Sequence, residues 1–169
     1  YVLGFNSMYN GVEIDRHFYR IGNAIILFDD IDSREEHEYS QLFHLSESMK
    51  IQSHSDTEVI MALADTGYIV RIQQISVTPP YLNIINGTDD TDYGHISRSM
   101  GLLDTITTLK FDMRCSSGSY ITVITIEDKD GFIELRQGLT DKPQKIKASD
   151  MVYDNINKTI LLDTISLQL

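Results

Sequence analysis

Hydrophobic and polar residues alternate along most of this chain. The alternation is clearest at residues 108–115, where every odd position is apolar and every even position is polar or charged. Because successive side chains of a β-strand point to opposite faces of a sheet, this pattern predicts a strand with one apolar and one solvated face. The apolar positions are Leu109, Phe111, Met113 and Cys115.

The residues that follow predict a meander. Residues 116–119 are small and polar and predict a turn, and residues 120–127 are rich in β-branched side chains that favour a second strand. A turn signal at residues 128–131 then returns the chain into a third strand at 132–136. We expect three consecutive antiparallel strands here.

The rest of the chain shows the same period of two, without a helical stripe of three turns. We expect a charged loop at 33–36, and most of the irregular structure at 76–103. Strands 23–29 and 120–127 are apolar on both faces, which predicts central positions. With the meander, the total is roughly ten to twelve short strands, typical of an all-β, antiparallel, multi-stranded β-sandwich. The further strands are expected at 12–20, 23–29, 37–45, 58–63, 67–75, 144–148 and 158–168.

Composition narrows the range of partners. The net charge is −11, and Lys and Arg are scattered singly rather than gathered in a stripe, which argues against nucleic acid and anionic lipid. No apolar run reaches the length of a membrane span, so we expect no membrane partner. The single cysteine, Cys115, excludes an intramolecular disulfide and is expected to be a buried free thiol. The 169 residues suit one domain, 1–169, which we expect to be excised from a longer chain.

Polar side chains that could bind a metal or take part in catalysis gather near the start of the chain. A charged strand leads through a turn into an apolar strand that ends in Asp29 and Asp30, and the next strand carries His37 and His44. Imidazole and carboxylate groups on neighbouring strands suit Zn²⁺, so Asp29 and His44 are candidate metal ligands. The alternative is that His44 is a half-buried strand residue bonded to its neighbour, and that the two carboxylates shape a turn.

These same residues resemble a known family. Tyr9, Arg16, the apolar strand that ends at Asp29, and the pair His44 and Leu45 are similar to the opening of the C-terminal domain of heparinase II/III-like proteins. That family pairs an α/α-toroid with a large antiparallel β-sandwich. One position departs from the pattern, because Ile14 stands where the family usually has a histidine.

The resemblance implies a function. It predicts a sandwich module of a polysaccharide lyase, or of a protein of bacterial capsule or exopolysaccharide metabolism, that supports β-elimination of an acidic polysaccharide. It also implies that the main catalytic groups lie on an upstream toroid domain, that this chain is inactive alone, and that the protein is periplasmic, secreted or on the cell surface. In elimination a base removes the proton next to a carboxylate while a cation neutralises that carboxylate.

Five residues between positions 9 and 20 are candidates for this chemistry. Tyr9, Arg16 and His17 are expected to support catalysis, and Tyr19 and Arg20 to bind substrate, although such side chains are also common on exposed strands. His17 follows Arg16 directly and should face the other side of a regular strand.

Two other functions stay open. A non-catalytic carbohydrate-binding or structural sandwich would use exposed aromatic residues, but the chain has no Trp, which sugar platforms often employ. An adhesive or virion-surface sandwich would fit the strand composition without any specific support. Metal content separates the lyase module from the non-catalytic carbohydrate-binding or structural module. The aromatic candidates are Tyr9, Tyr19, Tyr81 and Tyr93.

Overall fold

The structure is a computed structural model that describes residues 2–7, 9–88, 92–135, 142, 144–154, 159–162 and 165–168. The described residues form strands and one short 3₁₀ helix, η1, so the predicted all-β class is confirmed. No helix among them is long and apolar enough to cross a membrane. The elements are β1 Val2–Asn6, β2 Val12–Ile21, β3 Ala24–His44, β4 Met49–His54, β5 Glu58–Leu63, β6 Ile69–Gln74, β7 Tyr81–Asn86, β8 His95–Ser99, β9 Leu102–Thr105, β10 Thr107–Glu127, β11 Phe132–Leu135, β12 Gln144–Lys147, η1 Ala148–Asp150, β13 Met151–Asp154, β14 Thr159–Leu162 and β15 Ile165–Gln168.

Two long antiparallel strands organise the main sheet. β3 and β10 each contain 21 residues and pair with one another from Thr108 opposite His44 to Thr125 opposite Ala24. The eight-stranded sheet has the order β1-β2-β3-β10-β6-β5-β4, and β7 pairs with the first part of β10. Strands predicted to be central, 23–29 and 120–127, therefore do lie in the middle of the sheet.

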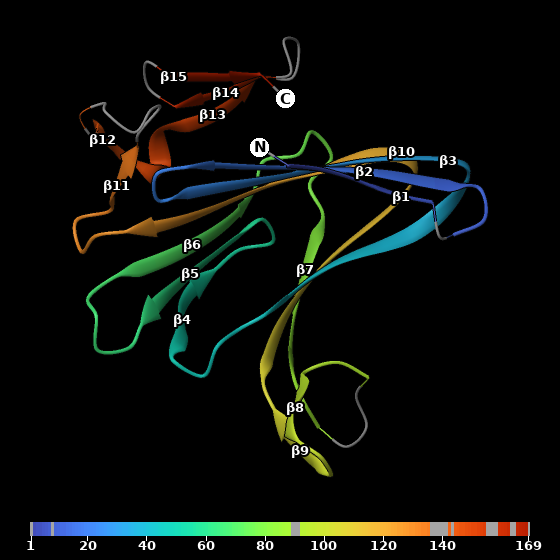
Figure 1. The fold of residues 1–169 in the computed structure, drawn as a ribbon, viewed down its shortest axis with the longest axis horizontal. Helices are drawn as coiled ribbons and strands as arrows, with labels where there is room; N and C mark the ends of the chain where they lie inside the picture. Colours follow the sequence, from blue (N-terminus) through green and yellow to red (C-terminus); the bar gives the residue numbers. More distant parts are fainter. Residues whose placement is uncertain are drawn as a thin grey trace.

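An irregularity bends the two long strands together. Between Cys115 and Ser117 the register with β3 shifts from His37 to Asp32, so residues 33–36 of β3 have no partner on β10. Such bulges bend a strand and reverse the side-chain alternation. In Figure 1, the far halves of β3 and β10 leave the flat part of the sheet and curve away with β7. We call the part around residues 24–32 and 117–127 the flat wing, and the part around residues 37–44 and 107–115 the curved wing.

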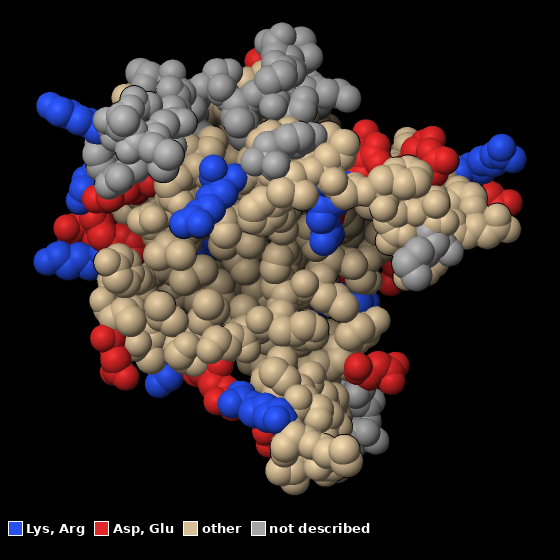
Figure 2. All heavy atoms as spheres, in the orientation of Figure 1, with Lys and Arg blue, Asp and Glu red and all other residues tan. Residues whose placement is uncertain are grey.

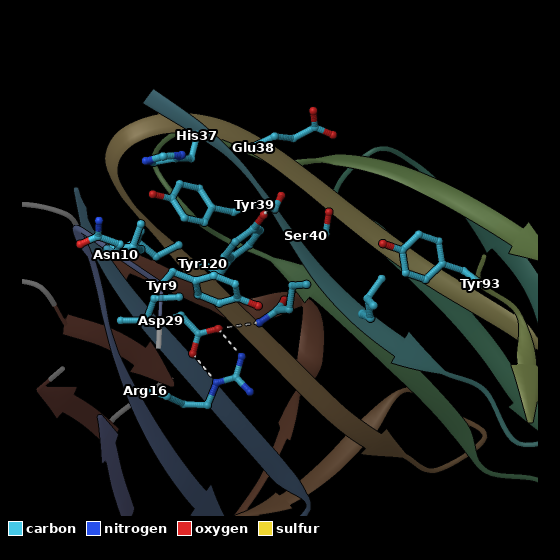
Figure 3. Close-up of a pocket in the computed structure, with 15 residues that line it drawn as sticks. Tyr9, Asn10, Arg16, Asp29, His37, Glu38, Tyr39, Ser40, Tyr93 and Tyr120 are labelled. Atoms are coloured by element: carbon cyan, nitrogen blue, oxygen red, sulfur yellow. Dashed lines mark hydrogen bonds and ion pairs between the residues drawn. The ribbon is translucent and has the colours of Figure 1, made fainter. Parts of the chain in front are cut away.

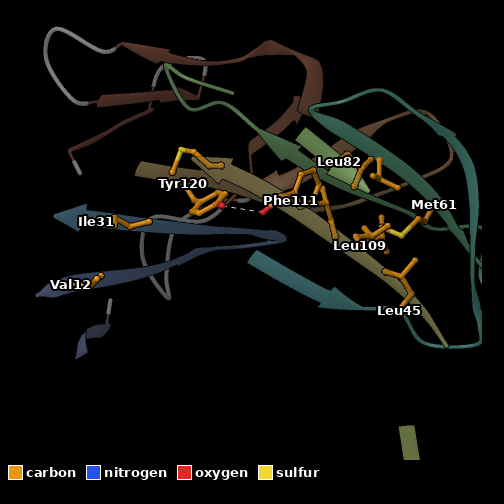
Figure 4. Close-up of a cluster of buried hydrophobic side chains, with 12 residues drawn as sticks. Val12, Ile31, Leu45, Met61, Leu82, Leu109, Phe111 and Tyr120 are labelled. Atoms are coloured by element: carbon orange, nitrogen blue, oxygen red, sulfur yellow. Dashed lines mark hydrogen bonds between the residues drawn. The ribbon is translucent and has the colours of Figure 1, made fainter. Parts of the chain in front are cut away.

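One apolar cluster fills the concave side between the wings. Its side chains come from the flat wing, from the β5-β6 pair and from the curved wing. Figure 4 shows β10 passing through this cluster and contributing side chains at several points along its length. Because the register shift reverses the alternation along β10, its odd residues in the curved wing and its even residues in the flat wing both point inward. Members contributed by β10 are Leu109, Phe111, Met113 and Tyr120.

A second apolar cluster covers the other face of the flat wing. Ile26 and Phe28 of β3 and Ile121 and Val123 of β10 pack there against the C-terminal strands. The β11-β12 and β13-β14-β15 sheets lie over this face (Figure 1). The two opposite faces of the flat wing are thus both buried, which explains why its two central strands are apolar at nearly every position.

The turn between β2 and β3 shows how closely the C-terminal layer approaches. Gly22 has a φ of 58°, and a Cβ atom at this position would clash with the carbonyl oxygen of Glu134 in β11. The neighbouring Asn23 amide donates a hydrogen bond to that same oxygen at 2.9 Å. Glycine is required here both for the left-handed backbone and for the space.

Four sequence predictions about the elements differ in detail from the structure. The predicted turn at 116–119 and loop at 33–36 lie inside continuous strands, where residues 117–119 of β10 pair with β3 and Ser33 of β3 pairs with Val12 of β2. Residues 76–103, expected to hold most of the irregular structure, contain β7, β8 and the start of β9. The last predicted strand, 158–168, comprises β14 and β15, which pair with each other; residues 158, 163 and 164 lie outside the described residues.

Charge is spread over the rim of the molecule. Figure 2 shows Asp and Glu side chains around the edge of the face in view, while the middle of that face carries few charged groups. Cys115 is half-buried against the apolar cluster between the two wings, and burial raises the pKa of its thiol. A raised pKa lowers the thiolate fraction at neutral pH, as expected of an unreactive cysteine.

Candidate functional site

A cleft of about 630 Å³ opens between the two wings. Its walls come from β2, from both halves of β3 and from β10, with Tyr93 from a loop. Figure 3 shows His37 and Tyr39 at one end of the cleft, Tyr120 in the middle, and Asp29 with Arg16 at the other end. The bend at residues 33–36 is what brings the two halves of β3 to face one another. The polar groups of the lining, other than tyrosine, are Asn10, Arg16, Asp29, His37, Glu38, Ser40 and Gln41.

An ion pair between Arg16 and Asp29 forms one end of the cleft. The register of β2 and β3 places the two residues directly opposite each other. Arg16 Nε donates to Asp29 Oδ1 and Arg16 Nη2 donates to Asp29 Oδ2, both at 2.6 Å. The Asp29 side chain is 4% exposed and that of Arg16 is 53% exposed. Hydrogen bonding to Asp29 raises the pKa of Arg16, so the guanidinium stays charged at any physiological pH.

The Asp29 carboxylate is also the start of a buried hydrogen-bond chain. Gln41 Nε2 donates to Asp29 Oδ2 at 3.2 Å, and Gln41 Oε1 accepts from Gln74 Nε2 at 2.8 Å and from Thr122 Oγ1 at 2.7 Å. Gln41, Gln74 and Thr122 are all buried. The chain links β3, β6 and β10, and it orients the Gln41 amide so that its NH₂ group faces Asp29.

Two tyrosines occupy the middle and the far end of the cleft. The Tyr120 hydroxyl lies 2.8 Å from the carbonyl oxygen of Tyr39 and 3.1 Å from that of Phe111, to which it donates. Burial raises the pKa of Tyr120 far above its ordinary value, so the phenol stays protonated. By contrast, the Tyr39 hydroxyl oxygen is buried and has no hydrogen-bond partner among the described residues. A buried donor of this kind is suited to a ligand acceptor.

The predicted site residues divide between the two faces of β2. Tyr9, Arg16 and Asp29 line the cleft. His17 lies on the opposite face, where its ring is stacked 6.4 Å from Tyr19 and packs at 5.5 Å against Phe28. This matches the expectation that His17 and Arg16 face opposite sides. Tyr19 packs against the second apolar cluster, which lies between the flat wing and the C-terminal strands.

Neither Tyr19 nor Arg20 belongs to the cleft lining, and Arg20 is exposed. The catalytic role expected of His17 and the substrate-binding roles expected of Tyr19 and Arg20 stay predictions. The cleft itself offers no support for them.

The residues near Asp29 do not fit the predicted zinc site. His44 is exposed near the end of β3, where its Nδ1 atom is hydrogen-bonded to Thr108 Oγ1 at 2.9 Å, and it does not line the cleft. Within the described part of the chain, no group of three or more His, Cys, Asp and Glu is arranged to hold a metal ion. Zinc sites in proteins are built from those side chains. Zinc at Asp29 and His44 thus remains a prediction without support in this geometry.

Several cleft residues were not identified as site residues from the sequence. Tyr39 and Gln41 lie on the same strand face as His37, so their alternation after residue 36 could have indicated that they share its surroundings. Tyr120 and Thr122 carried no such signal. They read as ordinary members of a β-branched strand, and only the bend brings them beside β3.

Comparison with known proteins identifies the fold. No protein-family model and no curated protein sequence matches the chain. Solved structures do match. A heparinase III aligns over 99% of this chain and 24% of its own, with a TM-score of 0.67 and 14% identity. The heparan sulfate lyase HepC from Pedobacter heparinus aligns over 83% of this chain and 22% of its own, with a TM-score of 0.63 and 12% identity.

A further heparinase III, the BT4657 gene product, aligns over 86% of this chain and 25% of its own, with a TM-score of 0.61 and 13% identity. The chain therefore spans about a quarter of the length of the solved proteins that it matches. The resemblance expected from residues 9–45 is confirmed at the level of fold: this chain has the fold of a β domain of heparinase III.

Proposed function

We propose that this chain is the sandwich module of a heparinase-like polysaccharide lyase, and that its cleft forms one wall of a binding site for an acidic polysaccharide. The remaining wall, with the principal acid and base of β-elimination, belongs to an upstream catalytic domain. The isolated chain binds the sugar but does not cleave it. The observation that carries this proposal is the cleft with Arg16 at its end, in a fold shared with a heparan sulfate lyase.

Arg16 supplies the group that recognises an acidic sugar. Asp29 engages Nε and Nη2, and no hydrogen bond within the described residues uses Nη1. The half-exposed guanidinium can therefore donate from Nη1 to a ligand carboxylate or sulfate while its orientation is held by Asp29. A cation in this position would neutralise a uronate carboxylate, which acidifies the neighbouring C–H bond for elimination.

Other cleft residues supply surface and proton donors. Tyr9 is 67% exposed and Tyr93 is 38% exposed, so both rings offer apolar surface that a sugar can contact. His37 and Tyr39 lie at the end opposite Arg16, with their rings 6.1 Å apart. Within this chain, His37 is better placed than His17 to support proton transfer, because His37 lines the cleft and His17 does not.

One observation favours a second function. The charge of Arg16 is already balanced by Asp29, and Glu38 adds a negative charge to the lining. An approximately neutral cleft with four tyrosines would suit an uncharged sugar in a non-catalytic carbohydrate-binding module. The two functions differ in the charge of the ligand that they require.

Calorimetry with paired ligands tests the proposal. Binding of an unsulfated, uronate-containing oligosaccharide from heparan sulfate is compared with binding of a neutral oligosaccharide of equal length. Arg16→Gln should weaken uronate binding by roughly ten- to hundredfold, because one hydrogen bond to a charged group contributes about 1.5–3 kcal/mol. Arg114→Gln is the matched control, since Arg114 is also an arginine in an ion pair but lies outside the cleft lining.

Three results would count against the proposal. Equal uronate affinity in Arg16→Gln and the unmodified chain would remove Arg16 from recognition. Preference for the neutral oligosaccharide would favour the binding-module alternative. Formation of an unsaturated product by the isolated chain, followed by its ultraviolet absorbance, would refute the claim that an upstream domain is needed.

A further inference from the structure

Asp29 carries a buried negative charge with one cationic partner among the described residues. Both of its oxygens bond to Arg16, and Oδ2 accepts a third hydrogen bond from Gln41. A carboxylate that is 4% exposed requires such partners, since removal of its water shell is otherwise strongly unfavourable. The bidentate geometry at 2.6 Å is the arrangement that a guanidinium forms best.

A metal ion at Asp29 would compete for these same oxygen lone pairs. It would have to displace the Arg16 guanidinium, and the next polar group in contact with Asp29 is the amide NH₂ of Gln41, which is a donor and not a ligand. Divalent zinc also repels a guanidinium at hydrogen-bond distance. The hydrogen-bonded surroundings of Asp29 therefore suit a fixed organic cation.

We infer that the Arg16 guanidinium is the resident cation of this cleft, held against Asp29 in the place that a metal ion would need, and that the cleft is assembled without a metal. The pair also has a mechanical role. Arg16 on β2 holds the Asp29 carboxylate of the flat wing, and this carboxylate accepts the hydrogen bond from Gln41 of the curved wing that links the two wings across the cleft. A structural metal ion performs the same task in other proteins.

This inference concerns the cleft of the proposed function but does not depend on sugar binding. The guanidinium is charged throughout the physiological pH range, as arginine always is, and the hydrogen bond to Asp29 raises its pKa further. The link between the wings should accordingly be insensitive to chelators. A link made by a metal ion would be sensitive to them.

The first measurement is metal content and thermal midpoint of the unmodified chain, with and without chelator and with added zinc. We expect no stoichiometric metal and no shift of the midpoint in either direction. A stoichiometric metal whose removal lowers the midpoint would overturn the inference.

The second measurement is chemical rescue. Arg16→Ala should lower the thermal midpoint by roughly 4–8 °C, because it leaves Asp29 buried without a cation. Millimolar ethylguanidinium should restore most of that loss, while potassium at equal ionic strength should not. Arg114→Ala is the matched control: Arg114 Nε lies 2.6 Å from Glu36 Oε1, but the two side chains are 74% and 57% exposed.

Rescue of Arg16→Ala alone supports the inference. Failure of rescue in a variant with an unchanged circular dichroism spectrum, or equal stabilisation of Arg114→Ala, would refute it. If Arg16→Ala does not fold, Arg16→Lys replaces it, since lysine keeps a cation without the bidentate geometry. We then expect a partial loss of the midpoint in Arg16→Lys, and no loss at all would refute the inference.

Discussion

A second buried carboxylate, Glu127, offers the sharpest test of how this sheet tolerates internal charge. Its side chain, at the end of β10, is 1% exposed. Arg71 Nε donates to Glu127 Oε1 at 2.7 Å and Nη2 donates to Oε2 at 3.3 Å, while Arg71 Nη1 donates to Glu58 at 2.5 Å. Thr125 Oγ1 adds a hydrogen bond at 2.8 Å. The perturbation is Arg71→Met, which keeps most of the aliphatic volume and removes the cation.

The expected loss follows from burial. Removing one partner of a buried ion pair costs about 3–5 kcal/mol, since the remaining charge stays out of water. We take the lower end, about 3 kcal/mol, because Arg71 is 17% exposed and Thr125 continues to donate to Glu127. For a chain of this size each kcal/mol moves the thermal midpoint by about 2–4 °C, so Arg71→Met should melt about 6–12 °C lower.

The assay is urea and thermal denaturation followed by circular dichroism. Arg114→Met is the control, because Arg114 forms an ion pair of similar length with Glu36 at an exposed position. Such surface pairs contribute about 0–1 kcal/mol, so the control should melt close to the unmodified chain. The double variant Arg71→Met with Glu127→Leu should recover most of the lost stability, because it removes the buried charge together with its partner.

Two results would refute the reasoning. If Arg71→Met and Arg114→Met lose equal stability, Glu127 is effectively solvated despite its buried position. If the double variant stays as unstable as Arg71→Met, the loss comes from packing of the arginine stem rather than from the unpaired charge.

Three further predictions concern the cleft and its frame. The pKa of Tyr120 is raised in the folded chain, so the unfolded chain loses the phenol proton first, and the free energy of unfolding should fall as pH rises above about 10. Urea unfolding of Tyr120→Phe should show a shallower decline of stability at alkaline pH. An unchanged slope would contradict this prediction. Gln41→Leu should lower the free energy of unfolding by about 1–3 kcal/mol in the same assay, since it removes hydrogen-bond partners from Asp29 and Gln74. An unchanged free energy would show that water replaces the amide. Gly22→Ala should destabilise the chain far more than Gly11→Ala, as both have positive φ but only Gly22 abuts the β11 backbone; equal thermal midpoints would contradict the close approach.

The cleft residues show why part of the site could be predicted. Arg16 was named as a catalytic candidate and Asp29 as a metal candidate, from their side-chain chemistry and the family resemblance. The structure pairs them because they lie opposite each other on adjacent strands joined by a short turn. The partition of Arg16 and His17 to opposite faces likewise follows from the alternation of a single strand. Gln74 and Thr122 are far from these residues in sequence, so no local pattern indicated that they belong to the hydrogen-bond network of Asp29. The position of Tyr120 in the cleft lacked a local signal for the same reason.

Sequence alone determined the all-β class and the central position of the two most apolar strands. These features depend on a period of two, which is local. The sequence named Tyr9 and Arg16 as candidates for catalysis and Asp29 as a candidate for metal binding, and the structure places all three along one cleft. Tertiary structure decided that residues 107–127 form one bent strand instead of two, that the bend opens a cleft, and that Arg16 rather than His44 is the partner of Asp29. Whether small polar residues form a turn or a bulge depends on the strands that pair alongside them, and those partners come from distant parts of the chain.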